Sequence, residues 1–256
     1  MNAAEISRVL VFMALSLQMS TLQASDFNLY SQGEAFQLNS DSLLYRETHC
    51  EALNGKSQEV IYKNSRDELI AFKTLDYSTG NLSPSFLQYN YGRDQSVEVL
   101  VKESSVSMVV KNTALSKIES SNDAKIDQRI PVVVDAGFDR YIKQNWDALV
   151  SGEQKQFQFP LASRSSLIEL RVGSASCNYQ SETDQCFKLE MANWLYRMLV
   201  DPILLGYDAD QKRLMRYRGL SNIEDKNGDG LIVDIHYRYS DFPAQVCEQS
   251  GHRLTL

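Results

Sequence analysis

The sequence predicts a β-rich α+β protein in which a large curved antiparallel sheet, an incomplete barrel, packs on one main amphipathic helix. Segments with strand-like composition recur about every 10–15 residues in both halves of the chain, joined by short polar turns. Residues 231–239 alternate strictly between two faces, which is the period of a strand with one buried face. Only residues 135–150 combine apolar side chains at helical spacing with signals for a helix start and stop.

Residues 1–24 are predicted to be a secretory leader. Arg8 precedes a short apolar core at residues 9–17, and Ala24 offers a small residue for cleavage. This core is shorter than the ~20 residues that a membrane-spanning helix needs. The expected mature chain, residues 25–256, forms a single domain that could be subdivided near residues 114–130. It is expected to be soluble and periplasmic, without stable membrane insertion.

The formal net charge of −7 and the absence of a basic cluster in the sequence argue against nucleic acid as a partner. They also give no polybasic segment for an anionic membrane.

The cysteine count predicts two disulfide bonds, because an even number of cysteines in an exported chain favours oxidised pairs. Cys177 and Cys186 flank a turn-like stretch and are expected to close a hairpin. Cys50 and Cys247 then pair by elimination. A zinc site is disfavoured because no CxxC motif exists and the three histidines lack ligand spacing. No cofactor is predicted.

In the first half, residues 25–42 are polar and weakly patterned and are expected to lie over the surface. Residues 114–129 are polar and predicted to be a mobile loop or linker between two halves of the sheet. Between them, the strand candidates are residues 43–52, 58–63, 69–77, 86–91, 96–101 and 107–112.

The predicted helix begins at Asp135 as N-cap and ends before Gly152. Its apolar positions are Phe138, Tyr141 or Ile142, Trp146 and Leu149. One interpretation is that this aromatic stripe packs on the sheet. The other is that the helix gates a ligand cavity, with Trp146 as its lid.

The second half continues with strand candidates at residues 156–161, 166–173 and 187–191, then one or two helical turns at 192–200 ended by Pro202. A strand at 203–207 leads into a hairpin whose return strand is residues 231–239. Leu231, Val233, Ile235, Tyr237 and Tyr239 share one face of that strand, and Ile232, Asp234, His236 and Arg238 share the other. The tail, from residue 241, is expected to be held by Cys247.

The turn of that hairpin fits the start of a calcium loop, with Asp225, Asn227 and Asp229 at alternate positions. However, the twelfth position is His236 rather than the bidentate Glu that completes such loops. Asn-Gly and Asp-Gly pairs are also typical of a plain turn, because these residues accept positive φ. The sequence favours the turn, assigns no metal site and leaves calcium binding undetermined.

No catalytic residue is assigned, since GxSxG, HExxH and phosphate-binding glycine motifs are absent from the sequence. His236 shares a strand face with Asp234 and Arg238, which allows a His–Asp pair but equally describes a solvated ion-pair face. His49 adjoins Cys50, and an exported cysteine is expected to be oxidised and inert.

Aromatic residues concentrate in the second half of the chain and supply the ligand-binding candidates. They would line an apolar cavity if the sheet curls around an incompletely packed helix, or fill a core if it does not. The candidates are Phe138, Trp146, Trp194, Tyr217, Tyr237 and Tyr239.

Two stretches carry a resemblance. Residues 207–237, YDADQKRLMRYRGLSNIEDKNGDGLIVDIHY, and residues 134–153, VDAGFDRYIKQNWDALVSGE, resemble uncharacterised exported proteins of Gram-negative bacteria. The order of strands and helices is more distantly similar to the periplasmic lipoprotein carriers. That resemblance implies an incomplete antiparallel barrel wrapped around helices, with an apolar cavity. The two predicted disulfides and the long first half depart from the carriers, and no carrier motif can be placed residue by residue.

These observations favour a periplasmic, non-enzymatic binding module for an apolar, lipid-like ligand or an envelope partner. The alternatives are a periplasmic hydrolase with a site near His236 and a purely structural envelope protein. The sequence determines neither the identity of a ligand, nor whether any catalytic activity exists, nor the oligomeric state.

Overall fold

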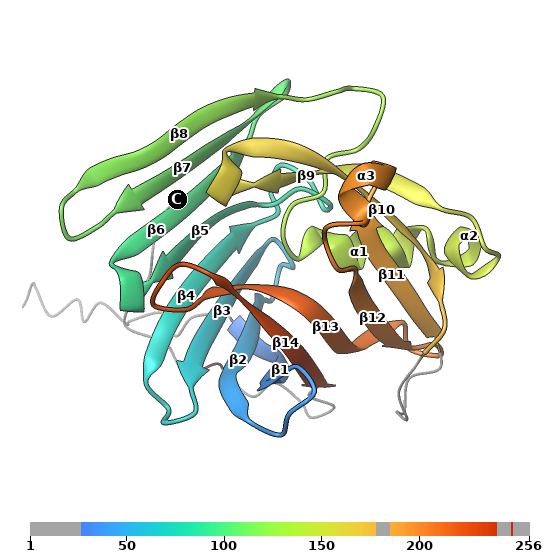
Figure 1. Ribbon diagram of the computed structural model, residues 1–256, viewed down its shortest axis with the longest axis horizontal. Helices are drawn as coiled ribbons and strands as arrows, with labels where there is room; N and C mark the ends of the chain where they lie inside the picture. The colour runs from blue at the N-terminus through green and yellow to red at the C-terminus, as the bar shows by residue number, and fades with distance from the viewer. Residues whose placement is uncertain (1–26, 178–184, 240–246, 248–256) are drawn as a thin grey trace, which may run out of the picture.

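The computed structural model describes residues 27–177, 185–239 and 247. The predicted leader and most of the predicted C-terminal tail lie outside the described residues. Every named strand belongs to one antiparallel sheet of 14 strands, which Figure 1 shows curving strongly around the helices. The two edge strands do not pair with each other, so the barrel is open. The predicted fold class, a large curved antiparallel sheet packed on a helical segment, is confirmed.

The sheet consists of two meanders that meet where the first strand pairs with the last. Within each meander every strand pairs with its neighbour in the chain, and the β1–β14 pairing joins the two in the order β8–β1 followed by β14–β9. The first meander comprises β1 Phe27–Gln37, β2 Leu43–Ala52, β3 Ser57–Asn64, β4 Leu69–Asp76, β5 Ser85–Asn90, β6 Gln95–Val101, β7 Ser105–Asn112 and β8 Lys117–Lys125. The second comprises β9 Lys155–Leu161, β10 Ser166–Ala175, β11 Gln185–Met191, β12 Ile203–Asp208, β13 Arg213–Glu224 and β14 Gly230–Tyr239.

Two segments for which no strand was predicted are strands. The expected surface stretch at residues 25–42 contains β1, which has a buried face, and the expected loop at residues 114–129 contains β8, so both expectations were wrong. β1 carries its small residues Ser31, Gly33 and Ala35 on the buried face, and no apolar alternation marks it. β8 is an edge strand whose side chains are mostly exposed on both faces, so its sequence reads as a polar loop. Backbone pairing with neighbouring strands, which needs no apolar side chains, creates both elements.

The predicted single helix is two helices, α1 Gly137–Gln144 and α2 Trp146–Val150, with Asn145 between them. Asp135 is not the N-cap, because its carboxylate instead accepts a hydrogen bond from the ammonium of Lys73 at 2.7 Å. The Lys73 side chain is only 1% exposed, and its charge must be paired inside the protein. Gly152 has a φ of +96° directly after the second helix, as a C-terminal capping glycine requires.

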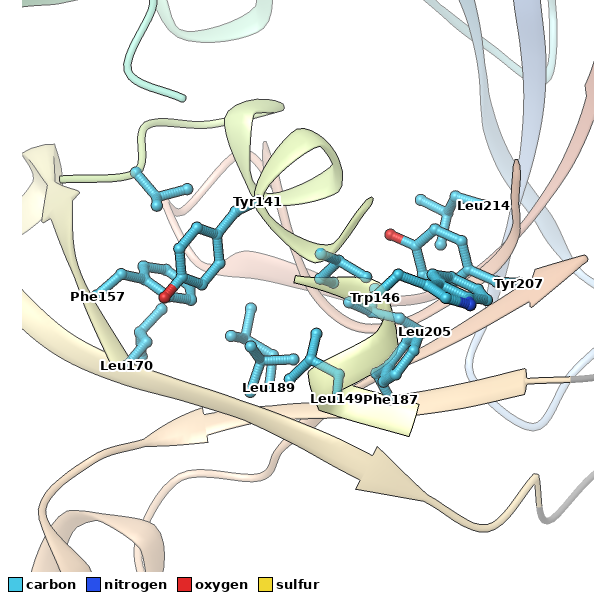
Figure 2. Close-up of a cluster of buried hydrophobic side chains, with 13 residues drawn as sticks. Tyr141, Trp146, Leu149, Phe157, Leu170, Phe187, Leu189, Leu205, Tyr207 and Leu214 are labelled. Carbon is cyan, nitrogen blue, oxygen red and sulfur yellow. The ribbon is translucent and has the colours of Figure 1, made fainter. Parts of the chain in front are cut away.

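The aromatic stripe of the helices packs on the second meander, as the first interpretation expected (Figure 2). The Trp146 ring meets Phe187 and Tyr207 edge to face, with ring centroids 5.2 and 5.5 Å apart. Tyr141 meets Phe157 in the same way at 5.1 Å. Such contacts add to the burial of these large side chains, and they anchor both helices inside the curved sheet.

The chain segment before the helices crosses from the edge strand β8 to the edge strand β9 and is held at β9 by one buried side-chain amide. Val132 forms a parallel bridge with Gln158 of β9. The Gln158 side chain donates to the carbonyls of Asp127 and Ile130 and accepts from the Asp127 amide. This one side chain therefore satisfies three backbone groups of the crossing segment.

Both predicted disulfides are confirmed. Cys50 of β2 is bonded to Cys247, whose backbone amide also donates to the Phe27 carbonyl. Cys177 and Cys186 close the connection between β10 and β11. The predicted helical turns at 192–200 are also present, as α3 Trp194–Arg197.

The Lys73–Asp135 pair gives a stability prediction. Replacing Asp135 by Asn should lower the free energy of unfolding by about 3 kcal/mol, because the buried ammonium loses its counter-charge. Adding Lys73→Met should recover part of that loss, since the uncompensated charge is then gone. Urea unfolding of the single and double variants measures both effects. Additive effects within about 0.5 kcal/mol would contradict the coupling.

Candidate functional site

The structure does not gather the six aromatic candidates into one site. Phe138 and Tyr217 lie with ring centroids 6.4 Å apart, and both pack against the same core cluster as Trp146. Tyr237 and Tyr239 lie on the concave side of β14, and both are partly buried. Trp194 stands apart from these five on α3, with 61% of its surface exposed.

Three tyrosine hydroxyls around the helices are engaged by the protein itself. Tyr141 and Tyr239 donate to the carbonyls of Gln156 and Leu214, each at 3.0 Å. Tyr207 donates to the Asp139 carboxylate, also at 3.0 Å. Burial raises the pKa of Tyr207 and Tyr239, so these phenols stay protonated and act as hydrogen-bond donors. The described interior on this side is thus packed and internally hydrogen-bonded.

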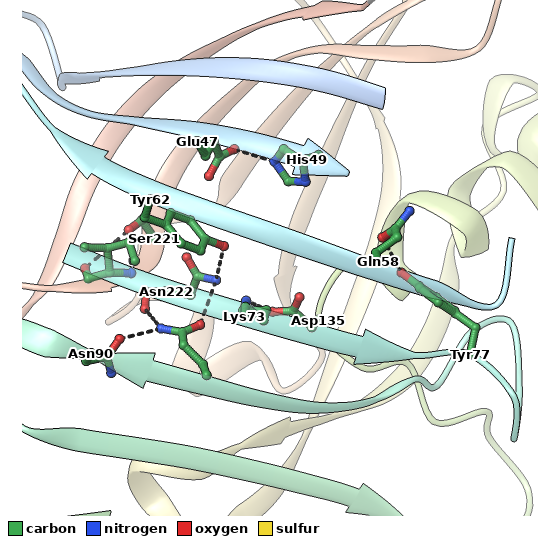
Figure 3. Close-up of polar contacts among 12 residues, drawn as sticks. Glu47, His49, Gln58, Tyr62, Lys73, Tyr77, Asn90, Asp135, Ser221 and Asn222 are labelled. Carbon is green, nitrogen blue, oxygen red and sulfur yellow. Dashed lines mark hydrogen bonds and ion pairs between the residues drawn. The ribbon is translucent and has the colours of Figure 1, made fainter. Parts of the chain in front are cut away.

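An acid–imidazole pair lies on the concave face of β2. His49 Nε2 is 3.2 Å from Glu47 Oε1, and Glu47 is buried (Figure 3). Opposite them is Gly33, where an added Cβ would lie 2.8 Å from the Glu47 side chain and 2.9 Å from Tyr237. The pair has the chemistry of a general acid and base but is packed tightly. Its two-residue spacing on a strand was the sequence signal that could have identified it.

A second polar cluster lies beneath the β13–β14 hairpin (Figure 3). The pairing register shifts between Leu220 and Glu224, and this irregular stretch contains Asn222. The side-chain amide of Asn222 donates to the Tyr62 hydroxyl at 3.2 Å, and the backbone carbonyl of Asn222 accepts from the Gln88 side chain at 3.2 Å. Gln88 also donates to Asn90 at 2.7 Å. These contacts fasten the hairpin over the first meander.

The DKNGDG segment has the geometry of a turn. One carboxylate oxygen of Asp225 accepts from the amides of Asn227 and Asp229, at 2.8 and 3.0 Å. These hydrogen bonds hold the Asp225 pKa below its ordinary value. The guanidinium of Arg93 lies against Gly228 and pairs with Glu224. The Asp225 carboxylate thus stabilises the backbone of its own turn. The positive charge beside the turn is the guanidinium of Arg93.

His236 lies on the outer face of the sheet and is half exposed. Its Nε2 is 3.3 Å from Asp234, whose carboxylate also accepts two hydrogen bonds from Arg216 and lies 3.2 Å from Arg218. This is the ion-pair face that the strand alternation indicated.

The most unusual surface feature is an apolar segment on and after α3. We call it the apolar knob. Each of its six side chains is 49–80% exposed, and no residue of α3 is buried. The knob consists of Trp194, Leu195, Tyr196, Met198, Leu199 and Val200. Of these six residues only Trp194 was a predicted ligand-binding residue, although the apolar run, interrupted only by Arg197, is visible in the sequence.

A group of charges lies at the base of the knob, centred on Glu190 of β11. Its carboxylate accepts from Arg171 at 2.8 Å and lies 3.0 Å from Lys188 and 3.7 Å from Arg197. Burial alone would raise the pKa of Glu190, but hydrogen bonds from Arg171 and Lys188 hold it below its ordinary value. Three cations therefore share one carboxylate, and we call these three the cationic collar.

A shallow hollow lies at the ends of β1 and β2, away from the knob. It is lined by Asn28, Leu29, Tyr30, Glu51, Ala52 and Leu53. Among the described residues, His, Cys, Asp and Glu side chains form no group of three or more that could hold a metal ion. Within the same part of the chain, no helix is long and apolar enough to cross a membrane.

No protein-family model matches this chain, and no curated protein matches it. Among solved structures, the chain is similar to a beta-barrel-like protein of the domain of unknown function DUF1849 from Brucella abortus. The sequence identity is 8% and the TM-score is 0.41, over 83% of this chain and 97% of that one.

The close packing around Glu47 gives a second prediction. Replacing Gly33 by Ala should destabilise the protein by about 1–3 kcal/mol, because the new methyl group must displace Glu47 or Tyr237. Gly92→Ala is a matched control, since an added Cβ there meets nothing within 4 Å. Thermal unfolding of both variants provides the measurement. Equal stabilities would contradict a tightly packed Glu47–Tyr237 contact.

Proposed function

We propose that this protein is an exported, periplasmic, non-enzymatic binding module that engages an apolar, lipid-like partner through the apolar knob. The observation that carries the proposal is the joint exposure of six large apolar side chains within seven consecutive residues. Scattered apolar residues are ordinary on protein surfaces, whereas a contiguous apolar patch of this kind marks an interaction site.

The knob has no evident role in folding, which supports a role in binding. None of the four residues of α3 is buried, and the principal packing partner of this helix is β11. Exposed apolar surface costs solubility and brings the folded chain no burial energy. Its retention is explained if a partner covers it.

The packing of the interior favours a surface site over the predicted cavity. A ligand between α2 and the sheet would have to displace Trp146 from its contacts with Phe187 and Tyr207. At the knob, a ligand meets apolar side chains without displacing any packed residue. The proposed ligand is therefore still apolar and lipid-like, as the sequence predicted. Of the six aromatic candidates, only Trp194 belongs to the proposed binding surface.

The compartment follows from covalent chemistry. Two disulfides bond all four cysteines, and such bonds persist in oxidising, exported environments. The periplasm is the part of this proposal that rests on the leader-like residues 1–24.

The surroundings of the candidate acid–base groups support a non-enzymatic role. Glu47 is buried and packed against the backbone of Gly33, which leaves a substrate little access. On the outer face, Asp234 divides its carboxylate between two arginines and His236. An imidazole that shares its carboxylate in this way is poorly placed to act as a catalytic base.

The proposal predicts saturable binding of an environment-sensitive naphthalene sulfonate dye. The double change Leu195→Ser, Leu199→Ser should weaken dye binding by roughly tenfold or more, since one buried leucine contributes at least ~1.5 kcal/mol. Trp146→Phe should leave dye affinity unchanged. A fluorescence titration measures each affinity, and circular dichroism checks the fold.

Leu115→Ser is the matched control, because Leu115 is as exposed as the knob leucines but lies between β7 and β8. Absence of saturable binding to the native protein would overturn the proposed function. An equal loss of affinity in the Leu115 variant would also overturn it.

A further inference from the structure

The chemical class of the partner that binds the apolar knob can be specified more closely, on the basis of the proposed function. We propose that the partner is the surface of a lipid bilayer with anionic headgroups, into which the knob inserts while the cationic collar meets the headgroups. The alternative is that the knob docks into a groove on another protein.

The distribution of the exposed side chains favours lipid over a groove. A helix that docks in a protein groove presents one apolar stripe and keeps a polar opposite face. In the knob, Leu195, Tyr196, Met198 and Leu199 are consecutive apart from Arg197, so apolar groups surround the helical turn. Figure 1 shows α3 as a short turn above β11 and β12, the strands that it connects. A fluid bilayer can surround such a projection on every side.

Several backbone amides of the knob are already hydrogen-bonded, which lowers the cost of moving them into lipid. The side chain of Asn193 accepts from the Leu195 amide at 2.9 Å and caps the turn. The amides of Leu199 and Val200 both donate to the Tyr196 carbonyl at 3.0 Å. These amides therefore already have partners when water is removed.

The order of side chains fits the depth profile of a membrane interface. Met198 and Leu199 are the most exposed residues of the knob, at 75% and 80%. Trp194 and Tyr196 are less exposed, at 61% and 55%. Met198 and Leu199 at the tip would thus enter the acyl region, and the two aromatic rings would lie at the headgroup level that Trp and Tyr favour, while Leu195 and Val200, at 53% and 49%, lie nearer the protein.

The charges near the knob suit an anionic surface. Arg197 is the only charged residue between Met191 and Val200, and its side chain is directed back toward Glu190. Together with Arg171 and Lys188 it places three cations at the base of the knob, of which Lys188 is the most exposed at 41%. Three carboxylates lie near them: Glu190 between the cations, Asp201 directly after the knob, and that of Glu169, whose backbone carbonyl accepts from the Ala192 amide. In a chain of net charge −7 the base of the knob is therefore close to neutral, and its exposed Lys188 can meet an anionic headgroup.

The length of the knob sets the mode of attachment. One helical turn reaches the interface but cannot cross a hydrocarbon core of about 30 Å. Attachment of the protein to the bilayer is therefore reversible and peripheral. A few apolar side chains and the headgroup charge stabilise it.

The test uses the full chain and vesicles of phosphatidylcholine, alone or mixed with phosphatidylglycerol. We expect the protein to co-float with the mixed vesicles, and its tryptophan emission to shift to the blue as the exposed Trp194 enters lipid. Leu195→Ser, Leu199→Ser should reduce the vesicle partition coefficient by roughly tenfold or more, and Leu115→Ser should not change it. Trp194→Phe should still bind vesicles but lose the blue shift, since Trp146 is already buried.

The collar gives a separate readout. Lys188→Gln should weaken binding to the mixed vesicles by about fivefold, because one lysine near an anionic surface contributes ~1 kcal/mol. Dye binding should stay unchanged. Lys63→Gln is the matched control, since Lys63 is similarly exposed and lies on β3.

The outcomes separate the two proposals. Dye binding without vesicle binding would overturn the lipid partner and leave the proposed function standing. Absence of both would overturn the proposed function itself. Vesicle binding that survives the double leucine change would place the membrane contact elsewhere and refute the role of the knob.

Discussion

The antiparallel pairing of β1 with β14 is the constraint on which the rest of this structure depends. It joins the first and last strands of the chain into one seam, and without it the two meanders would be separate sheets. The Cys50–Cys247 disulfide reinforces the same seam over a sequence separation of 197 residues. A covalent link across so long a loop removes many conformations from the unfolded chain. At the seam Gly33 faces Tyr237, and its missing side chain leaves space for that ring and for Glu47.

Because the seam joins the two meanders into one curved sheet, the sheet wraps around the helices although the barrel stays open. The helices fill the space inside this curve, so a ligand has little room there. Gln158 fastens the crossing segment, and the Lys73–Asp135 pair holds the start of the helical region. The aromatic stripe then fills the space above the second meander. The hydroxyls of Tyr141, Tyr207 and Tyr239 are held there by partners from the same chain. The curved sheet suggests a container, but its interior is packed where the helices lie. Among the described residues, the longest run of exposed apolar side chains lies outside the barrel, on and after α3.

The cationic collar is not visible as a basic cluster in the sequence, because its three residues meet only in the folded protein. Arg171, Lys188 and Arg197 belong to β10, β11 and α3 and are distant in the sequence. Strand pairing places Arg171 opposite Glu190, and the turn of α3 returns Arg197 to the same carboxylate. The arrangement also explains how the knob stays apolar, because its one charged side chain is directed toward the protein.

The sequence by itself determined the elements whose pattern is local. Alternation predicted β14, helical spacing predicted the aromatic stripe, and cysteine spacing predicted the Cys177–Cys186 bond, which left Cys50 and Cys247 to pair by elimination. It did not reveal β1 or β8, because backbone hydrogen bonds to neighbouring strands create them and their side chains carry no apolar period. Asp135 read as a helix cap because Lys73, 62 residues earlier, is invisible to local analysis. Whether Trp146 or Trp194 is accessible depends on what covers each ring, and only the tertiary structure decides that, because burial is a property of packing between distant segments.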